Sequence, residues 1–270
     1  MGNIGRQFEH LRDSGKKGFI PFVTAGDPDL DTSLEIVLKL VELGADVIEL
    51  GVPFSDPMAD GPVIQRSSQR ALANGTNLIG VLELAAAVRQ RSAVPLVLFS
   101  YLNPILQFGL ETFRDQAAKA GIDGLLITDI VDDEAVKLST FIGESGIDLI
   151  SLIAPTTTDE RLQKICENAR GFVYAVSRAG VTGARADTSS EAENLVRRAH
   201  RFSDLPIAVG FGISTSDQIE NVWKYADAAV VGSAIVAEIE RSNSPEEVVP
   251  NVEKFIRILL PQFAKNGIEN

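Results

Sequence analysis

Short apolar runs alternate with amphipathic segments along the whole chain. Each run is rich in Val, Ile and Leu, and each is followed by a segment whose apolar residues recur at helical spacing. Near-continuous apolar strands between amphipathic helices indicate a parallel sheet that is covered by helices. Strands are predicted at residues 18–24, 46–51, 95–100, 123–128, 148–152, 171–176, 206–209 and 228–231.

Helices are predicted in the intervening segments, and two of them start at residues that can cap a helix, Asp31 and Thr158. The predicted helices are 31–43, 63–73, 78–90, 110–120, 133–144, 158–168, 189–201, 214–225, 233–240 and 245–260.

Eight strand-and-helix units in about 250 residues are the signature of the (β/α)₈ barrel, or TIM barrel, an α/β fold. A doubly wound open sheet is the alternative, but no glycine-rich dinucleotide fingerprint follows the first predicted strand. The chain shows no linker, low-complexity tract or second domain. We therefore expect residues 1–270 to form a single TIM-barrel domain with extra helices.

Composition narrows the range of functions. The net charge of −12 disfavours binding to a nucleic-acid backbone or an anionic membrane through bulk electrostatics. A single cysteine, Cys166, excludes a disulfide framework and favours the cytoplasm. The histidines, His10 and His200, have no metal-ligand companions, so we expect no metal site and no His-based triad. The first residues lack an apolar signal core, and no apolar run reaches transmembrane length.

The stretch from Glu49 to Pro62 is where candidate chemistry gathers. Glu49 lies near the end of the second predicted strand, and Asp60 lies in the loop that follows it. In a barrel of this type the chemistry sits at the carboxyl ends of the strands. Burial should raise the pKa of Glu49, and two carboxyls with different pKa values can act as proton acceptor and proton donor. The alternatives are that Glu49 pairs with a buried cation and that Asp60 and Asp56 are turn residues.

Two further glycine-containing regions follow later strands. Residues 177–185 are long and polar, which is the composition of a lid or of an ordinary surface loop. Residues 210–214 and 232–234 follow the seventh and eighth strands, where barrels usually bind phosphate, and the second range opens a helix. Tight strand-to-helix turns are the alternative reading of those glycines.

The residues alone therefore indicate a cytosolic barrel enzyme that acts on a phosphorylated small molecule by proton transfer between carboxyl groups. Such an enzyme would use no metal, thiol or histidine. Aldol-type cleavage, isomerisation and elimination all remain open at this point.

Several motifs make the chain resemble the tryptophan synthase alpha subunit family, the indole-3-glycerol-phosphate lyases, from about Phe8 to Leu260. The resemblance is carried by Pro21–Pro28, Glu49–Pro57, Ala59–Pro62, Ser177–Arg178, Gly180–Gly183 and Gly210–Ile213. It implies a TIM barrel that reversibly cleaves indole-3-glycerol phosphate to indole and glyceraldehyde 3-phosphate, within tryptophan biosynthesis.

The resemblance also implies roles for particular residues. Glu49 and Asp60 fall on the family's two catalytic carboxylates. Asp60 would hold and help deprotonate the indole ring nitrogen, and Glu49 would move protons at ring C3 and at the side-chain hydroxyl. The substrate-binding positions that carry over are Phe22, Phe99, Tyr101, Leu126, Leu152, Tyr174, Gly183, Phe211, Gly212, Gly232 and Ser233.

A partner is implied in the same way. The family forms an α₂β₂ heterotetramer with a beta subunit that joins indole to serine, and indole passes between the sites. Pyridoxal phosphate would belong to that partner, and we expect no cofactor in this chain. The loop after the second strand would face the partner, with Asp56 as a contact.

One position departs from the family pattern. After the fourth strand the family usually reads Asp-Leu-Pro, and this chain reads Asp129-Ile130-Val131. The difference concerns subunit coupling rather than the chemistry. The rival hypotheses are a stand-alone lyase without a beta partner, a regulatory subunit without activity, and a sugar-phosphate isomerase on the same fold.

Overall fold

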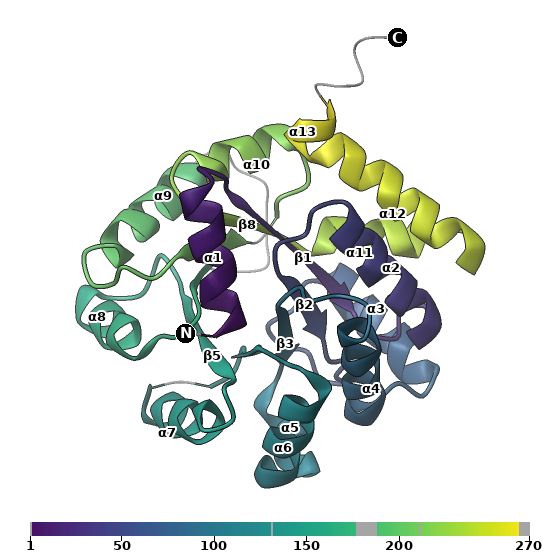
Figure 1. Ribbon diagram of the computed structural model, residues 1–270, viewed down its shortest axis with the longest axis horizontal. Helices are drawn as coiled ribbons and strands as arrows, with labels where there is room; N and C mark the ends of the chain where they lie inside the picture. Colours follow the sequence, from purple (N-terminus) through teal and green to yellow (C-terminus); the bar gives the residue numbers. More distant parts are fainter. Residues whose placement is uncertain (1, 131, 177–187, 211, 265–270) are drawn as a thin grey trace.

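Eight parallel strands close into a barrel in the computed structural model, which describes residues 2–130, 132–176, 188–210 and 212–264 (Figure 1). Neighbouring strands follow chain order, and β8 pairs with β1 to complete the ring. The strands are β1 (Gly18–Thr24), β2 (Ile48–Gly51), β3 (Leu96–Ser100), β4 (Gly124–Ile127), β5 (Asp148–Ile153), β6 (Val173–Val176), β7 (Ile207–Gly210) and β8 (Ala228–Val231). The prediction of a TIM barrel is confirmed.

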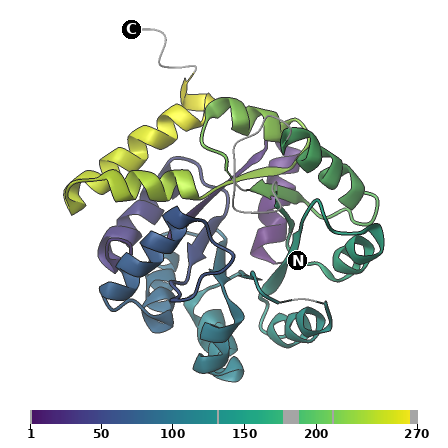
Figure 2. The same cartoon turned by 180° about the vertical axis from the view of Figure 1, so that it is seen from behind.

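Helices surround the strands on the outside, and Figure 2 shows the same ring from behind. They are α1 (Asn3–Asp13), α2 (Leu30–Glu42), α3 (Pro62–Ala73), α4 (Leu78–Arg89), α5 (Leu102–Phe108), α6 (Leu110–Ala120), α7 (Asp132–Gly143), α8 (Asp159–Asn168), α9 (Thr188–Ala199), α10 (Ser216–Trp223), α11 (Ser233–Arg241), α12 (Pro245–Leu259) and α13 (Pro261–Ala264). Most predicted boundaries hold to within two residues.

The strands divide the core into two parts because successive side chains point to opposite faces. Side chains that point outward pack against the helices and form the larger cluster. Side chains that point inward fill the barrel with residues such as Ile20, Val47, Val97 and Ile150. Glu49 lies two residues after Val47 in β2, so it belongs to the inward-facing set.

Side-chain caps mark the starts of α2, α4, α8 and α10 in the part of the chain that the structure describes. Thr158 caps α8 as predicted, with its side chain accepting a hydrogen bond from the backbone N–H of Arg161. The predicted cap of α2 was wrong. Asp29 caps that helix and accepts a 2.7 Å hydrogen bond from the N–H of Thr32, whereas Asp31 lies within the first turn. Both aspartates suit a helix start, and only the backbone geometry separates them.

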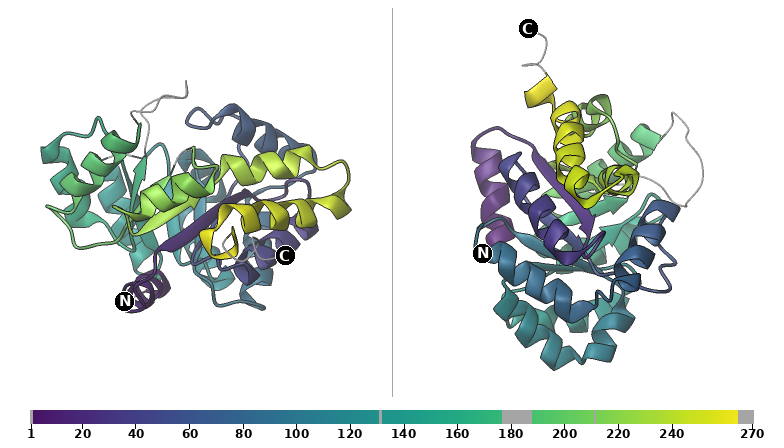
Figure 3. Two further views of the ribbon diagram at one scale, coloured as in Figure 1. Left: turned by 90° about the horizontal axis from the view of Figure 1, so that it is seen from above. Right: turned by 90° about the vertical axis from the view of Figure 1, so that its right-hand side faces the viewer.

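The pattern analysis did not predict α1 or α5. The buried face of α1 consists of Ile4, Phe8 and Leu11, which join the cluster inside the barrel. The Phe8 ring lies 5.6 Å from the Phe172 ring between centroids. Helix α1 therefore closes one end of the barrel interior, and the left view of Figure 3 shows it beside the N-terminus, at the lower left of the molecule.

Ion pairs hold α3 in place between β1 and α11. Arg70 donates two hydrogen bonds of 2.8 and 2.7 Å to the buried Asp27 carboxylate and a third of 2.8 Å to Glu240. Arg66 donates two more, of 2.6 and 2.7 Å, to Glu240. Bidentate guanidinium–carboxylate pairs fix orientation as well as distance. The network ties α3, which begins two residues after Asp60, to α11.

Within the described ranges, no single helix is both long and apolar enough to cross a membrane. One helix pair, α3 with α4, reaches that length and composition together, and it is bent by 97° at its break.

Candidate active site

A cavity of about 470 Å³ opens at the carboxyl ends of the strands. Both predicted carboxyl groups, Glu49 and Asp60, line it. The remaining lining residues are Phe22, Ala59, Gly61, Pro62, Val63, Ile64, Phe99, Thr128, Leu152, Tyr174, Val176, Gly212, Val230, Gly232 and Ser233. An apolar chamber with a few polar groups is the usual form of a site for a small organic molecule.

Glu49 is a buried carboxyl group in the wall of this cavity. Its side chain is 1% exposed, and neither carboxyl oxygen has a hydrogen-bond partner within the described residues. No ion pair to Glu49 occurs in the described part of the chain, so the alternative of a buried Glu–cation pair finds no support there. Burial raises the pKa of Glu49 to about 8. The group is therefore largely protonated at neutral pH and can serve as an acid.

Asp60, the second carboxyl group of the cavity, differs from Glu49 because it has a hydrogen-bond partner. Burial raises its pKa to about 6, and a hydrogen bond from Tyr101 lowers the pKa in part. Tyr101 Oη donates to Asp60 Oδ2 at 3.1 Å and accepts a 2.9 Å hydrogen bond from the N–H of Ala59. Asp60 is thus largely ionised at neutral pH, which makes it a hydrogen-bond acceptor while Glu49 is a donor.

Aromatic rings form the walls beside Glu49. Phe22 pairs with Glu49 in the β1–β2 register, and its ring meets Phe99 edge-on with 5.3 Å between centroids. Tyr174 is a further buried ring in the cavity wall, and its pKa is raised well above the usual value by burial and then by the charge of Glu49. A wall built from two phenylalanine rings suits a flat aromatic ligand.

The start of helix α11 offers backbone donors to the cavity. Helix α11 starts at Ser233 with Gly232 as its N-cap, and no side chain caps it. The first hydrogen bond of the helix runs from the N–H of Val236 to the carbonyl of Gly232, so the preceding N–H groups have no partner inside the helix. Gly212 lies nearby in the cavity wall with a positive φ of 83°. Such a helix start favours an anion.

Most of the residues predicted to bind substrate are brought together here. Phe22, Phe99, Leu152, Tyr174, Gly212, Gly232 and Ser233 line the cavity. Two others do not line it. Leu126 is fully buried in the barrel interior, and Tyr101 is hydrogen-bonded to Ala59 and Asp60, which do line the cavity. Four of the sequence predictions lie outside the described residues: Val131, the lid at 177–185, Gly183 and Phe211.

The sequence analysis missed several lining residues. Ala59, Gly61, Pro62, Val63 and Ile64 come from the loop and the first turn of α3 around Asp60. Their position in the sequence next to Asp60, a candidate site residue, could have identified them. Nothing in the sequence identified three other lining residues before the strand register was known: Thr128, Val176 and Val230.

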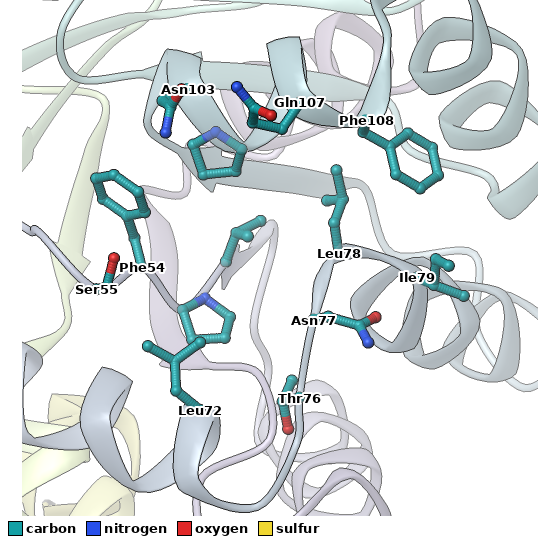
Figure 4. A pocket seen from close by; sticks show the side chains of 13 residues that line it. Phe54, Ser55, Leu72, Thr76, Asn77, Leu78, Ile79, Asn103, Gln107 and Phe108 are labelled. Carbon is teal, nitrogen blue, oxygen red and sulfur yellow. The ribbon is translucent and has the colours of Figure 1, made fainter.

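A second hollow of about 420 Å³ lies between the β2–α3 loop, the α3–α4 connection and α5 (Figure 4). Phe54 lines it from the loop, and Asn103, Gln107 and Phe108 line it from α5. The Phe54 ring also packs on Tyr101 with 5.0 Å between centroids. The hollow is therefore connected through two rings to Asp60. Asp56, which the sequence predicted to face a partner, is exposed in the same loop and accepts a hydrogen bond from Ser55.

The arrangement can protonate one atom of a bound aromatic ring while holding positive charge at another. Glu49 supplies a proton in an apolar setting, Asp60 supplies a negative charge, and α11 supplies an anion site. All three converge on one cavity with aromatic walls.

Comparison with known proteins agrees with this geometry. The family model described as tryptophan synthase alpha chain matches residues 8–262. The tryptophan synthase alpha chain of Caulobacter vibrioides (strain NA1000 / CB15N) is 48% identical over 263 residues, which cover 97% of this chain and 94% of that protein. That of Prochlorococcus marinus subsp. pastoris is 46% identical over 256 residues, 94% of this chain and 91% of the relative.

Solved structures extend the similarity to three dimensions. A chain in the crystal structure of tryptophan synthase from M. tuberculosis, in its aminoacrylate-bound form, superposes with a TM-score of 0.84. It is 34% identical, and the alignment covers 95% of this chain and 97% of that one.

Proposed function

The chain belongs to the tryptophan synthase alpha chain family, and we propose that Glu49 and Asp60 are the two groups that carry out the family's lyase reaction in its barrel cavity. That reaction cleaves indole-3-glycerol phosphate, in tryptophan biosynthesis. The observation that carries the assignment is the pair of carboxyl groups in one cavity whose pKa values, about 8 and about 6, straddle neutral pH.

Asp60 acts first on the indole ring. Its carboxylate accepts a hydrogen bond from the ring N–H and stabilises the positive charge that appears when C3 is protonated. Glu49 supplies that proton from its neutral carboxyl group, which burial keeps protonated. The product of this step is an indolenine-like cation held between the two groups.

The cleavage step then reprotonates Glu49 with a second proton, while the first stays on C3 of the indole. The newly formed Glu49 carboxylate takes the proton of the side-chain hydroxyl next to C3. The O–H electrons form the aldehyde carbonyl, the carbon–carbon bond breaks, and its electrons restore the aromatic ring. Indole and glyceraldehyde 3-phosphate leave, and both carboxyl groups are in their starting states. Each proton-transfer role is worth about 10²–10⁴ in rate.

The cavity accommodates the two ends of this substrate in separate places. The indole ring fits against the wall that Phe22, Phe99 and Leu152 form. The phosphate fits at the start of α11, where Gly232 and Ser233 present backbone donors. Backbone donors explain how a chain with a net charge of −12 can hold an anion.

We also infer a beta partner that receives the indole, in an α₂β₂ assembly. The support is the similarity to a chain from a whole tryptophan synthase, together with the hollow beside Phe54 and the exposed Asp56. Pyridoxal phosphate would belong to that partner. Among the described lining residues of the cavity none is lysine, the side chain that forms a Schiff base with this cofactor.

Release of indole from indole-3-glycerol phosphate, followed by a colour reaction, tests the proposal. The purified chain is compared with Glu49→Gln and Asp60→Asn, each alone and with a beta subunit. We expect each variant to lose at least about 100-fold in kcat and the beta subunit to stimulate the parent. Glu111→Gln and Asp31→Asn, two exposed positions, are the matched controls.

Full activity of Glu49→Gln or Asp60→Asn would refute the assigned roles. Rapid turnover of the chain alone, with no stimulation by a beta subunit, would instead indicate a stand-alone lyase and remove the inferred assembly while leaving the chemistry in place.

A further inference from the structure

Thr128 is a polar residue in the cavity wall that the reaction outlined above does not use. It follows directly after β4, and its side chain lines the cavity. The hydroxyl oxygen is shielded from water, and it makes no hydrogen bond of ordinary geometry with a described residue. A buried hydroxyl without a partner destabilises a fold, so its presence in a reaction chamber calls for an explanation.

The strand register places Thr128 beside Tyr101. Phe99 pairs with Leu126, and Ser100 pairs with Ile127, in the parallel ladder between β3 and β4. The ladder continues one step further, because the N–H of Thr128 donates a 3.1 Å hydrogen bond to the carbonyl of Ser100. Tyr101 and Thr128 are thus neighbours at the carboxyl ends of adjacent strands.

A second contact fixes this corner of the barrel. The Asp129 carboxylate accepts a 2.8 Å hydrogen bond from the N–H of Leu102, the residue after Tyr101. The backbone around Tyr101 is therefore bound to the backbone around Thr128 on both sides.

Tyr101 Oη has room for this donor. A phenol oxygen donates one hydrogen bond and has two lone pairs that can accept. Its proton goes to Asp60 Oδ2, and one lone pair accepts from the N–H of Ala59. The second lone pair has no hydrogen bond from another described residue, and Thr128 is the hydroxyl beside it.

We propose that Thr128 is a positioning residue for Asp60: its hydroxyl donates to Tyr101 Oη and thereby strengthens the hydrogen bond by which Tyr101 holds the Asp60 carboxylate. A hydroxyl that accepts a hydrogen bond becomes a stronger donor, so the three groups form a cooperative chain that ends on Asp60. The inference rests on the proposed catalytic role of Asp60 and adds a residue that acts through Tyr101.

The electrostatics of the cavity agree with this direction. Burial and then the charge of Asp60 raise the pKa of Tyr101, whereas the Ala59 N–H and, to a smaller extent, the Thr128 hydroxyl lower it. The titratable groups that line or back the cavity in the described residues are Glu49, Asp60, Tyr101 and Tyr174. Of these, Tyr101 is the one that lies between Thr128 and Asp60.

Titration of Asp60 by ¹³C NMR, in protein labelled at aspartate Cγ, tests the chain without relying on activity. The Asp60 signal is the one missing from Asp60→Asn. We expect Thr128→Val to raise the pKa of Asp60 by about 0.3 pH unit and Thr128→Ser to leave it unchanged. Tyr101→Phe should raise it by roughly 1–2 pH units, and adding Thr128→Val to that variant should then have no further effect. The acid limb of kcat/KM should move with each change.

Thr140→Val, at an exposed hydroxyl on α7, is the matched control. An unchanged Asp60 titration in Thr128→Val would overturn the inference. So would a loss of kcat/KM that is as large in the Tyr101→Phe background as in the parent, because Thr128 would then contact the substrate directly. Loss of the proposed function is seen separately, as full activity of Asp60→Asn.

Discussion

Glu49 lies beside Phe22 in the parallel ladder between β2 and β1, and on its other side it pairs with Val97 of β3. An ionisable side chain is therefore flanked by two apolar residues on adjacent strands. Tyr174 adds a further buried ring nearby. This placement explains why burial, with no compensating charge, sets the proton affinity of Glu49.

The first prediction concerns stability. The pKa of Glu49 is about 8 in the folded chain and about 4.5 in the unfolded chain. Between these values the folded state holds a proton that the unfolded state lacks, so stability falls as pH rises from about 5 to 8. Glu49→Gln removes this penalty, and at pH 7 we expect it to be more stable than the parent by about 3 kcal/mol.

Urea unfolding of both proteins at pH 5, 6, 7, 8 and 9 measures the effect. The difference in unfolding free energy should grow up to about pH 8 and then level off. Glu111→Gln, at an exposed position, should show no such trend. A constant difference across this range would mean that Glu49 is not a buried neutral acid.

The second prediction is a bell-shaped dependence of kcat/KM on pH. Activity requires ionised Asp60 and protonated Glu49, so the limbs should lie near pH 6 and pH 8. The phosphate of the substrate also titrates near the acid limb. Tyr101→Phe distinguishes the two, because it removes the donor that lowers the pKa of Asp60. The acid limb should move to higher pH in this variant. If the limb does not move, it reports the titration of the phosphate and not that of Asp60.

The barrel could be predicted from the sequence because its strands are continuous apolar runs, and that pattern does not depend on distant contacts. The helices that were missed depend on such contacts. The apolar face of α1 is buried only because it packs on the open end of the barrel, where Phe8 contacts Phe172. Helix α5 starts at Leu102, whose N–H donates a hydrogen bond to the carboxylate of Asp129, 27 residues further along the chain.

The candidate site divides in the same way. Glu49 stands out in the sequence because a carboxyl group within an apolar strand is costly without a task or a partner. Asp60 was indistinguishable from a turn residue, and its raised pKa follows from loop packing and from Tyr101. Thr128 carried no signal at all, because a threonine after a strand is ordinary and only the register places it beside Tyr101.

The third prediction tests the anion site at the start of α11. Ser233→Asp places a negative charge beside the free N–H groups that we assign to the phosphate. The charge suits the helix start, so the fold should persist. Repulsion between the two anions should raise KM for indole-3-glycerol phosphate by roughly 10- to 100-fold. The affinity for indole itself, measured by calorimetry, should not change, and a lowered affinity for both ligands would contradict this assignment.

The fourth prediction concerns the aromatic wall. A Cβ on Gly51 would lie 2.5 Å from the Phe22 ring, which must then move towards the cavity. We expect Gly51→Ala to destabilise the fold by about 1–3 kcal/mol and to weaken indole binding more than it lowers kcat. The check is urea unfolding together with indole affinity. Phe22→Leu in the same chain makes room for the new methyl group, and the double variant should recover stability relative to Gly51→Ala.

The fifth prediction addresses the inferred partner surface. Asp56 is exposed in the loop that also carries Phe54, and Phe54 packs on Tyr101. Reversal of charge in Asp56→Lys should leave the rate of the chain alone unchanged and reduce stimulation by a beta subunit by roughly 10-fold, because one surface contact becomes repulsive. The measurement is indole release across a titration of beta subunit. Asp13→Lys, an exposed position at the end of α1, is the matched control. Equal stimulation of both variants would show that the partner surface does not include this loop.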